Sequence, residues 1–298
     1  MKRKKGRARP APRSTGTALA PAVEKEVPKV AAKEIGALMG EPKVRRTVLM
    51  IGAGAVFDSW KAVYAALKQL YPNLHEDGCT HAFANLVHRL RWLAHAARRD
   101  PTAQSALGNQ LAQYSRLKEV LSAELLAAAD TGRFAFASYG KGLIKRLLSE
   151  SPDLKVITTN WDKTLDQLIQ ELGSPPKMAR LHLHGLATAP STLYLPTEAL
   201  DEVYRQETER ELKSLRNAHE LAINWIANCD RLVVYGLNFS PHDPELGMVT
   251  VAGFHRRTRH CDIEVHDRTP APVVANLRFY CDSAFLRSIT PTTVPTGS

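Results

Sequence analysis

The chain has 298 residues, of which 44% are apolar, and a formal net charge of +10. This length suits one large α/β domain or two small ones. No apolar run approaches the roughly 18 residues that span a bilayer, and no apolar segment of a secretory signal follows the basic N-terminus. The composition therefore argues against a membrane-spanning or secreted protein, and we expect a cytoplasmic location with no membrane partner.

The positive charge is concentrated at the N-terminus. Seven Lys and Arg residues precede the first acidic residue, Glu24, so the rest of the chain carries only +3. Residues 1–41 are rich in Lys, Arg, Pro and Ala and lack a core pattern, which predicts a disordered basic arm. Such an arm either contacts nucleic acid or an acidic partner, or serves only for solubility.

The cysteines show no metal-binding pattern. None of the four stands in a C-x-x-C pair, so we expect free, partly buried thiols and no metal site. The four are Cys79, Cys229, Cys261 and Cys281.

The first predicted strand opens the folded domain, which we expect to cover residues 42–288. Val48 to Ile51 form a continuous apolar run that ends in Gly52-Ala53-Gly54, as in a parallel strand buried on both faces. From Asp58 to Glu150 the period is almost entirely helical. This stretch predicts a helical second lobe inserted after the first strand.

Four further strands alternate with helices along the rest of the chain. They are predicted at residues 155–159, 180–184, 231–235 and 262–266. This alternation predicts an α/β fold with a doubly wound, Rossmann-like parallel sheet. The Pro/Thr-rich residues 289–298 are predicted to form a flexible C-terminal tail.

Glycine and polar residues follow each predicted strand, where ligands of doubly wound sheets bind. Singly these signals are weak: a glycine pair often makes a tight turn, Asn-x-Asp often caps a helix, and Phe57 replaces the third glycine of G-x-G-x-x-G. Their convergence on one rim is the stronger signal. The residues are Gly52, Ala53, Gly54, Asn160, Asp162, His184, Gly236, Asn238, Ser240 and Asp267.

In this combination the sequence resembles the sirtuin-like NAD-consuming family, especially its bacterial branch of antiviral NAD hydrolases. The resemblance rests on VLMIGAGA, VITTNWDKTLDQLI, RLHLHG, LVVYGLNFSPHD and IEVHD, which occur in the family's order and span most of residues 47–282. It implies that NAD is the substrate and that nicotinamide and ADP-ribose are the products. It also implies a homo-oligomer, or a subunit of a defence complex with a sensor or activator protein.

The resemblance also implies a role for each candidate residue. Asn160 would orient the nicotinamide ribose and the attacking water, Asp162 would support its loop, and His184 would act as general base. The cofactor-binding residues would be Gly52, Ala53, Gly54, Thr159, Gly236, Asn238, Ser240 and Asp267.

The sequence departs from the family's protein deacylases at two places. It lacks their four-cysteine zinc module, and it reads AVFDSWKAV where they usually carry a G-I-P-D-F-R-like stretch. Both departures favour NAD hydrolysis over deacylation. The alternatives are a deacylase or ADP-ribosyltransferase, an NAD or ADP-ribose sensor without turnover, and a nucleic-acid-associated subunit that uses the basic arm.

Overall fold

A computed structural model describes residues 45–295, except 174–177, 201, 206 and 281–285. The predicted basic arm of residues 1–41 and Cys281 lie outside the described residues. Within these residues, no helix is both long and apolar enough to cross a membrane.

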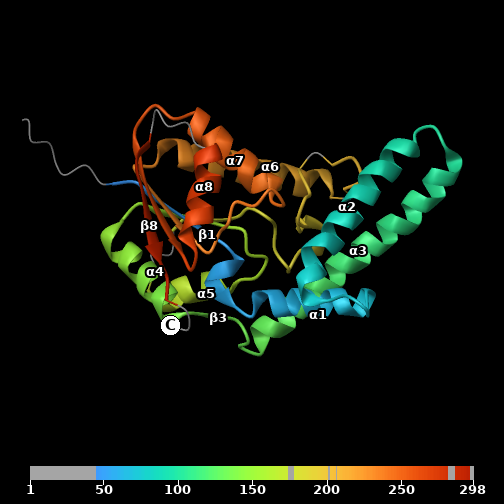
Figure 1. Ribbon diagram of the computed structural model, residues 1–298, viewed down its shortest axis with the longest axis horizontal. Helices are drawn as coiled ribbons and strands as arrows, with labels where there is room; N and C mark the ends of the chain where they lie inside the picture. Colours follow the sequence, from blue (N-terminus) through green and yellow to red (C-terminus); the bar gives the residue numbers. More distant parts are fainter. Residues whose placement is uncertain (1–44, 174–177, 201, 206, 281–285, 296–298) are drawn as a thin grey trace, which may run out of the picture. The chain divides into compact units, whose positions relative to one another are not determined.

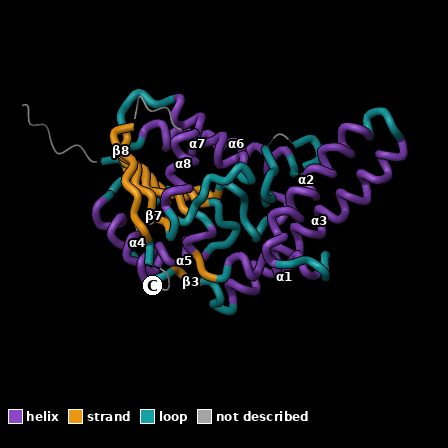
Figure 2. Tube along the Cα trace, viewed as in Figure 1, coloured by secondary structure: helices purple, strands orange, loops and turns teal. Residues whose placement is uncertain are grey.

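The centre of the fold is a six-stranded sheet in which every neighbouring pair is parallel (Figures 1 and 2). Its spatial order is β5-β4-β1-β6-β7-β8. Counted in chain order within the sheet, this is 3-2-1-4-5-6, the order of doubly wound dinucleotide-binding folds. The predicted α/β fold class is confirmed. The strands are β1 (Thr47–Ile51), β4 (Leu154–Thr158), β5 (Arg180–His182), β6 (Arg231–Tyr235), β7 (Cys261–Asp267) and β8 (Leu286–Thr293).

Eight α-helices, a short second sheet and three single-turn 3₁₀ helices at Ala53–Ala55, Glu76–Gly78 and Pro190–Thr192 complete the described part of the chain. Strands β2 (Val56–Phe57) and β3 (Ala135–Phe136) form that sheet as an antiparallel pair. The helices are α1 (Ser59–Leu70), α2 (Cys79–Ala96), α3 (Pro101–Asp130), α4 (Ser138–Glu150), α5 (Thr164–Glu171), α6 (Glu209–Asn228), α7 (Pro244–His255) and α8 (Pro270–Tyr280).

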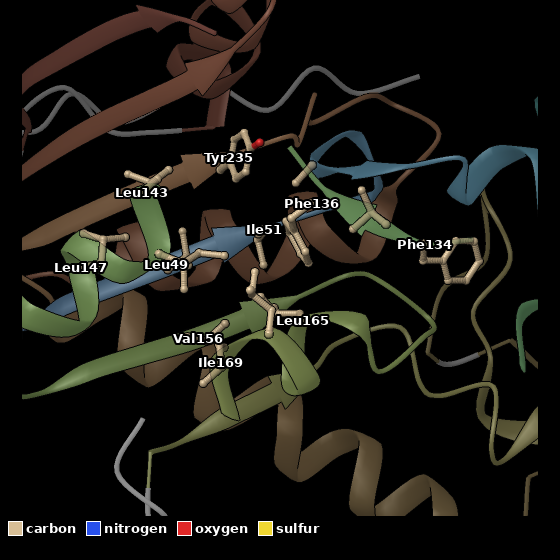
Figure 3. Close-up of a cluster of buried hydrophobic side chains, with 14 of the residues drawn as sticks. Leu49, Ile51, Phe134, Phe136, Leu143, Leu147, Val156, Leu165, Ile169 and Tyr235 are labelled. Atoms are coloured by element: carbon tan, nitrogen blue, oxygen red, sulfur yellow. The ribbon is translucent and has the colours of Figure 1, made fainter. Parts of the chain in front are cut away.

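Strand β1 lies between β4 and β6 and is buried along its whole length. Because successive side chains of a strand point to opposite faces, its apolar run supplies both layers of core. Leu49 and Ile51 face the layer of α4 and α5, where Leu143 and Leu165 also lie (Figure 3). The side chains at positions 48 and 50 face α6, α7 and α8.

Helices α1, α2 and α3 form a separate lobe with its own apolar core. Phe83 of α2 and Leu117 and Leu121 of α3 are almost fully buried there. The segment between β5 and α6 adds Leu193 and Tyr204 to the same core. That segment therefore ties the lobe to the strand ends of the main sheet.

The predicted boundary of the helical lobe, residues 58–150, is wrong at its C-terminal end. Helix α4 lies in this range, but Leu143 and Leu147 pack on the main sheet beside Leu49 (Figure 3). Helical periodicity identifies an apolar face but does not identify the core that receives it.

The prediction of a flexible tail over residues 289–298 is wrong for residues 289–293, which belong to β8. This strand pairs in parallel with β7, with Pro291 opposite Val265. A proline lacks the N–H of a ladder hydrogen bond and is tolerated on an edge strand, which is the position of β8 in the sheet. The Pro/Thr composition therefore marked an edge strand.

Candidate functional site

A cavity of about 420 Å³ lies at the carboxyl ends of the strands. It includes the residues that follow β1 and β6, the neighbouring strands at which the strand order reverses and at which doubly wound folds bind their ligands. Residues at the ends of five strands line one side, and residues of α1, α2, α3 and the segment 194–198 line the other. The predicted site residues on its wall are Ala53, Gly54, Thr159, Asn160, Asp162, His184, Gly236, Asn238, Ser240 and Asp267.

The glycines bring two strand ends into backbone contact. Gly54 N donates to the carbonyl of Gly236 at 3.1 Å, and Gly52 N donates to the carbonyl of Tyr235 at 3.1 Å. A Cβ at Gly236, whose φ is +63°, would lie 2.3 Å from the backbone nitrogen of Ala55. Gly52 is not among the cavity-lining residues, and the N–H groups of Gly52 and Gly54 are already paired within the protein.

Asn160 lines the cavity and has an unpaired side-chain amide. Its residue is 4% exposed, and neither amide atom of its side chain has a hydrogen-bond partner. Its backbone is held, since Asn160 N donates to Thr158 Oγ1 at 3.1 Å and its carbonyl lies 3.1 Å from His182 Nδ1. Leaving a buried amide unpaired costs about 1–3 kcal/mol, so this side chain is suited to a bound polar group.

Asp162 makes a hydrogen bond to the main chain just after Asn160. Its Oδ1 accepts a hydrogen bond from Thr164 N at 2.8 Å, beside the start of α5. The carbonyl of Trp161 accepts from Ala187 N at 2.7 Å. Asp162 also lies on the cavity wall.

His184 lies just beyond β5 and faces Asp243. The residue is 9% exposed, and its Nε2 lies 3.1 Å from Asp243 Oδ1, although the N–H direction misses hydrogen-bond geometry. Such contacts often tighten only when substrate binds. The next residue, Gly185, has φ +77°, and a Cβ there would lie 2.3 Å from the carbonyl oxygen of Thr192.

Sequence reasoning missed Asp243 as a site residue. It lines the cavity, and its Oδ1 also accepts from Leu246 N at 3.0 Å as the cap of α7. The local signal was present, because an Asp followed by Pro244 is typical of a helix start. The contact with His184 spans 59 residues of sequence, which a local pattern does not reveal.

A polar part of the cavity wall is partly committed to turns. Ser240 N donates to Asn238 Oδ1 at 3.0 Å, and Asp267 Oδ1 accepts from Thr269 N at 2.8 Å. Arg268 also lines the cavity and adds a cation beside Asp267. These hydroxyl, amide and charged groups suit a ribose or phosphate.

Buried ionic contacts anchor the wall on the lobe side. Glu198 accepts from Tyr114 Oη at 2.5 Å and from Leu195 N at 2.7 Å, and lies 3.8 Å from Lys118 Nζ. Burial lowers the pKa of Lys118 to about 8, although Glu198 opposes this shift. These contacts join α3 to the segment that carries Tyr194, whose ring lies 6.1 Å from that of His184.

Comparisons with known proteins assign no family. No protein-family model and no curated protein matches the chain. One similar solved structure is described as concerning the mechanism and regulation of Sir2 enzymes; it has TM-score 0.36, 15% identity, and coverage of 84% of this chain and 88% of that one. Another concerns sirtuin substrate affinity, with TM-score 0.30, 13% identity, and coverage of 89% and 95%. Such low scores carry no argument about activity, and the fold class rests on the sheet itself.

Proposed function

We propose that the chain is an NAD glycohydrolase that cleaves the nicotinamide–ribose bond to give nicotinamide and ADP-ribose. The observation that carries the proposal is the buried, unpaired amide of Asn160, which lines the same cavity as His184 at the strand-order switch. The switch point of a 3-2-1-4-5-6 sheet is the site where dinucleotides bind. The polar residues Asn238, Ser240 and Asp267 would receive the adenosine half.

The chemistry requires few groups. As the C–N bond breaks, its electron pair leaves with nicotinamide and positive charge develops on the ribose. Water then adds to the sugar carbon and gives up a proton. Positioning and electrostatic stabilisation dominate such a reaction. The amide of Asn160 both donates and accepts, so it would hold the ribose and the water together.

His184 would take the proton from the attacking water, and Asp243 would orient the His184 imidazole. If the neutral imidazole carries its proton on Nε2, which lies 3.1 Å from Asp243 Oδ1, its lone pair is on Nδ1. Proton transfer of this kind typically contributes about 10²–10⁴ in rate. Asp243 is thus the positioning residue of the pair.

We further propose that the activity serves as an abortive-infection antiphage effector in a homo-oligomer or in a complex with a sensor or activator. The resemblance of the five quoted segments supports this role. Uncontrolled NAD loss would harm the host, so we expect inactive and active assembly states. High constitutive turnover in a strict monomer would contradict this part of the proposal.

Product analysis tests the proposed reaction. Purified protein incubated with NAD should release nicotinamide and ADP-ribose in equal amounts without any acylated peptide. Nicotinamide release that depends on an acyl-lysine peptide would indicate a deacylase instead. ADP-ribose attached to protein would indicate a transferase, and tight binding without products would indicate a sensor.

A further inference from the structure

The ring of His182 is held at both of its nitrogens. Nε2 lies 2.8 Å from Asp166 Oδ2, and Nδ1 lies 3.1 Å from the backbone carbonyl oxygen of Asn160. The three residues come from β5, from α5 and from the loop after β4. His182 does not line the cavity, whereas Asn160 does. His182 therefore contacts the loop that carries the site and leaves the cavity itself to His184.

Both partners of the ring are acceptors. A carbonyl oxygen has no proton to donate, and a carboxylate accepts only. Burial raises the pKa of Asp166. The hydrogen bond and charge of His182, together with the charges of Arg180 and Lys163, lower this pKa by more than burial raises it, so the net shift is downward. Arg180 lies 3.3 Å from the other carboxylate oxygen. A neutral imidazole has one N–H and satisfies one acceptor, so two such bonds require two ring protons.

The contact with Asn160 fixes the main chain at the residue that offers its side chain to the cavity. Asn160 N is tied to Thr158 Oγ1, and Thr159 N to the carbonyl of Ile51 at 3.1 Å. Among these ties, His182 supplies a side-chain bond from a different strand. Its loss would free the Asn160 carbonyl, and the amide on the same residue would lose its fixed direction.

We propose that His182 is a positioning residue that acts as an imidazolium clamp, donating to Asp166 and to the Asn160 carbonyl so that the Asn160 amide is aimed at the bound dinucleotide. The identity of that ligand rests on the proposed function. The clamp itself is a property of the free protein. The two histidines, two residues apart, therefore have different roles: His184 lines the cavity, and His182 does not.

Nitrogen NMR of the histidine rings in the ligand-free protein tests the clamp directly. The His182 signals, identified by their loss in His182→Gln, should show both ring nitrogens protonated near neutral pH. In Asp166→Asn, which keeps a side chain of the same shape, one nitrogen should lose its proton. A single protonated ring nitrogen at His182 in the wild-type protein would overturn the proposal.

Hydrogen exchange and kinetics test the positioning. Losing a hydrogen bond to a charged donor is worth about 1.5–3 kcal/mol, or roughly 10- to 100-fold in rate. In both variants, exchange over residues 158–164 should accelerate by at least ~10-fold, and kcat should fall 10- to 100-fold with little change in NAD affinity. The exposed, remote substitution His88→Gln is the matched control and should alter neither.

The two proposals fail in different ways. Unchanged exchange over residues 158–164 in folded His182→Gln or Asp166→Asn would overturn the positioning role. If the wild-type protein released no nicotinamide, the hydrolase proposal would fail, while the NMR and exchange results would still decide the clamp. Should His182→Gln fail to fold, Asp166→Asn and the wild-type spectrum still test whether His182 acts as the clamp.

Discussion

At the scale of single residues, the site depends on which polar groups already have partners. The carboxylate of Asp162 and the N–H groups of Gly52 and Gly54 are committed within the protein. The amide of Asn160 is not. A buried group without a partner is the one that gains most from a ligand, because binding removes its desolvation penalty. This contrast separates the groups that shape the loops from those that would meet substrate.

The substitution Asp243→Asn should separate the two contacts of this carboxylate. Asn is as good an N-cap as Asp, so α7 and the melting temperature should be retained. The charge that faces His184 Nε2 is lost, and NAD turnover should fall roughly 10- to 100-fold. Turnover would be compared with that of Asp100→Asn, the cap of α3. Equal turnover of Asp243→Asn and wild type would remove Asp243 from the mechanism.

At the scale of elements, the approach of two backbones at Gly236 sets the shape of the cavity floor. Gly236→Ala combines a positive φ with a contact at 2.3 Å, and should destabilise the protein by about 2 kcal/mol or more. Gly142 of α4 is the matched control, because a Cβ there meets nothing within 4 Å. Gly142→Ala should stabilise by about 0.5–1 kcal/mol. Urea unfolding measures both, and similar values for the two variants would contradict this account.

The ion pair between β6 and β7 should make stability depend on acid pH. His266 and Arg231 lower the pKa of Glu264 from 4.5 to about 2, and Arg231 makes the well-formed contacts, at 2.7 and 2.9 Å. A carboxylate whose pKa is lower in the folded state than in the unfolded state stabilises the fold at pH values above its unfolded-state pKa. This stabilisation is lost as the pH falls through the folded-state pKa.

Above pH 4.5 the free energy of unfolding of the wild type should therefore exceed that of Glu264→Gln by about 2 kcal/mol, and this difference should shrink as the pH falls toward 2. Denaturant unfolding at a series of pH values measures it. Glu220→Gln, which breaks an exposed pair with Arg256, should show little such dependence. A constant difference between wild type and Glu264→Gln would refute the assignment.

The elements that sequence alone predicted are those whose signal is local. Strand β6 matches its predicted range, residues 231–235, because a continuous apolar run meets a glycine. Strand β8 was missed because Pro291 reads as a loop signal unless the strand is known to lie at a sheet edge. Ten of the eleven predicted site residues line one cavity, since parallel strands bring their carboxyl ends together. The partners Asp243 and Asp166 depend on tertiary contacts that no spacing encodes.

At the scale of the whole domain, the cavity is lined both by the main sheet and by the helical lobe. The sheet contributes Gly54, Asn160 and Gly236, and the lobe contributes Trp60 and Val63. A ligand that fills the cavity should therefore stabilise both, because it binds only when the two are folded together.

NAD should protect both sides from hydrogen exchange. Asn160→Ala, which should bind without turnover, avoids loss of the ligand during the measurement. Peptides that cover residues 52–55 and 236–240 on the sheet side, and α1 and 194–198 on the lobe side, should all exchange more slowly with NAD. Protection confined to one side would contradict a shared cavity.

The central claim is that this cavity breaks the nicotinamide–ribose bond. The most direct measurement follows nicotinamide and ADP-ribose from NAD with wild type, Asn160→Ala and His184→Ala, together with NAD binding by each. The account predicts turnover by wild type that falls by at least about a hundredfold in both variants while binding persists. Wild-type protein that binds NAD tightly and releases no nicotinamide, or variants that retain full turnover, would contradict it.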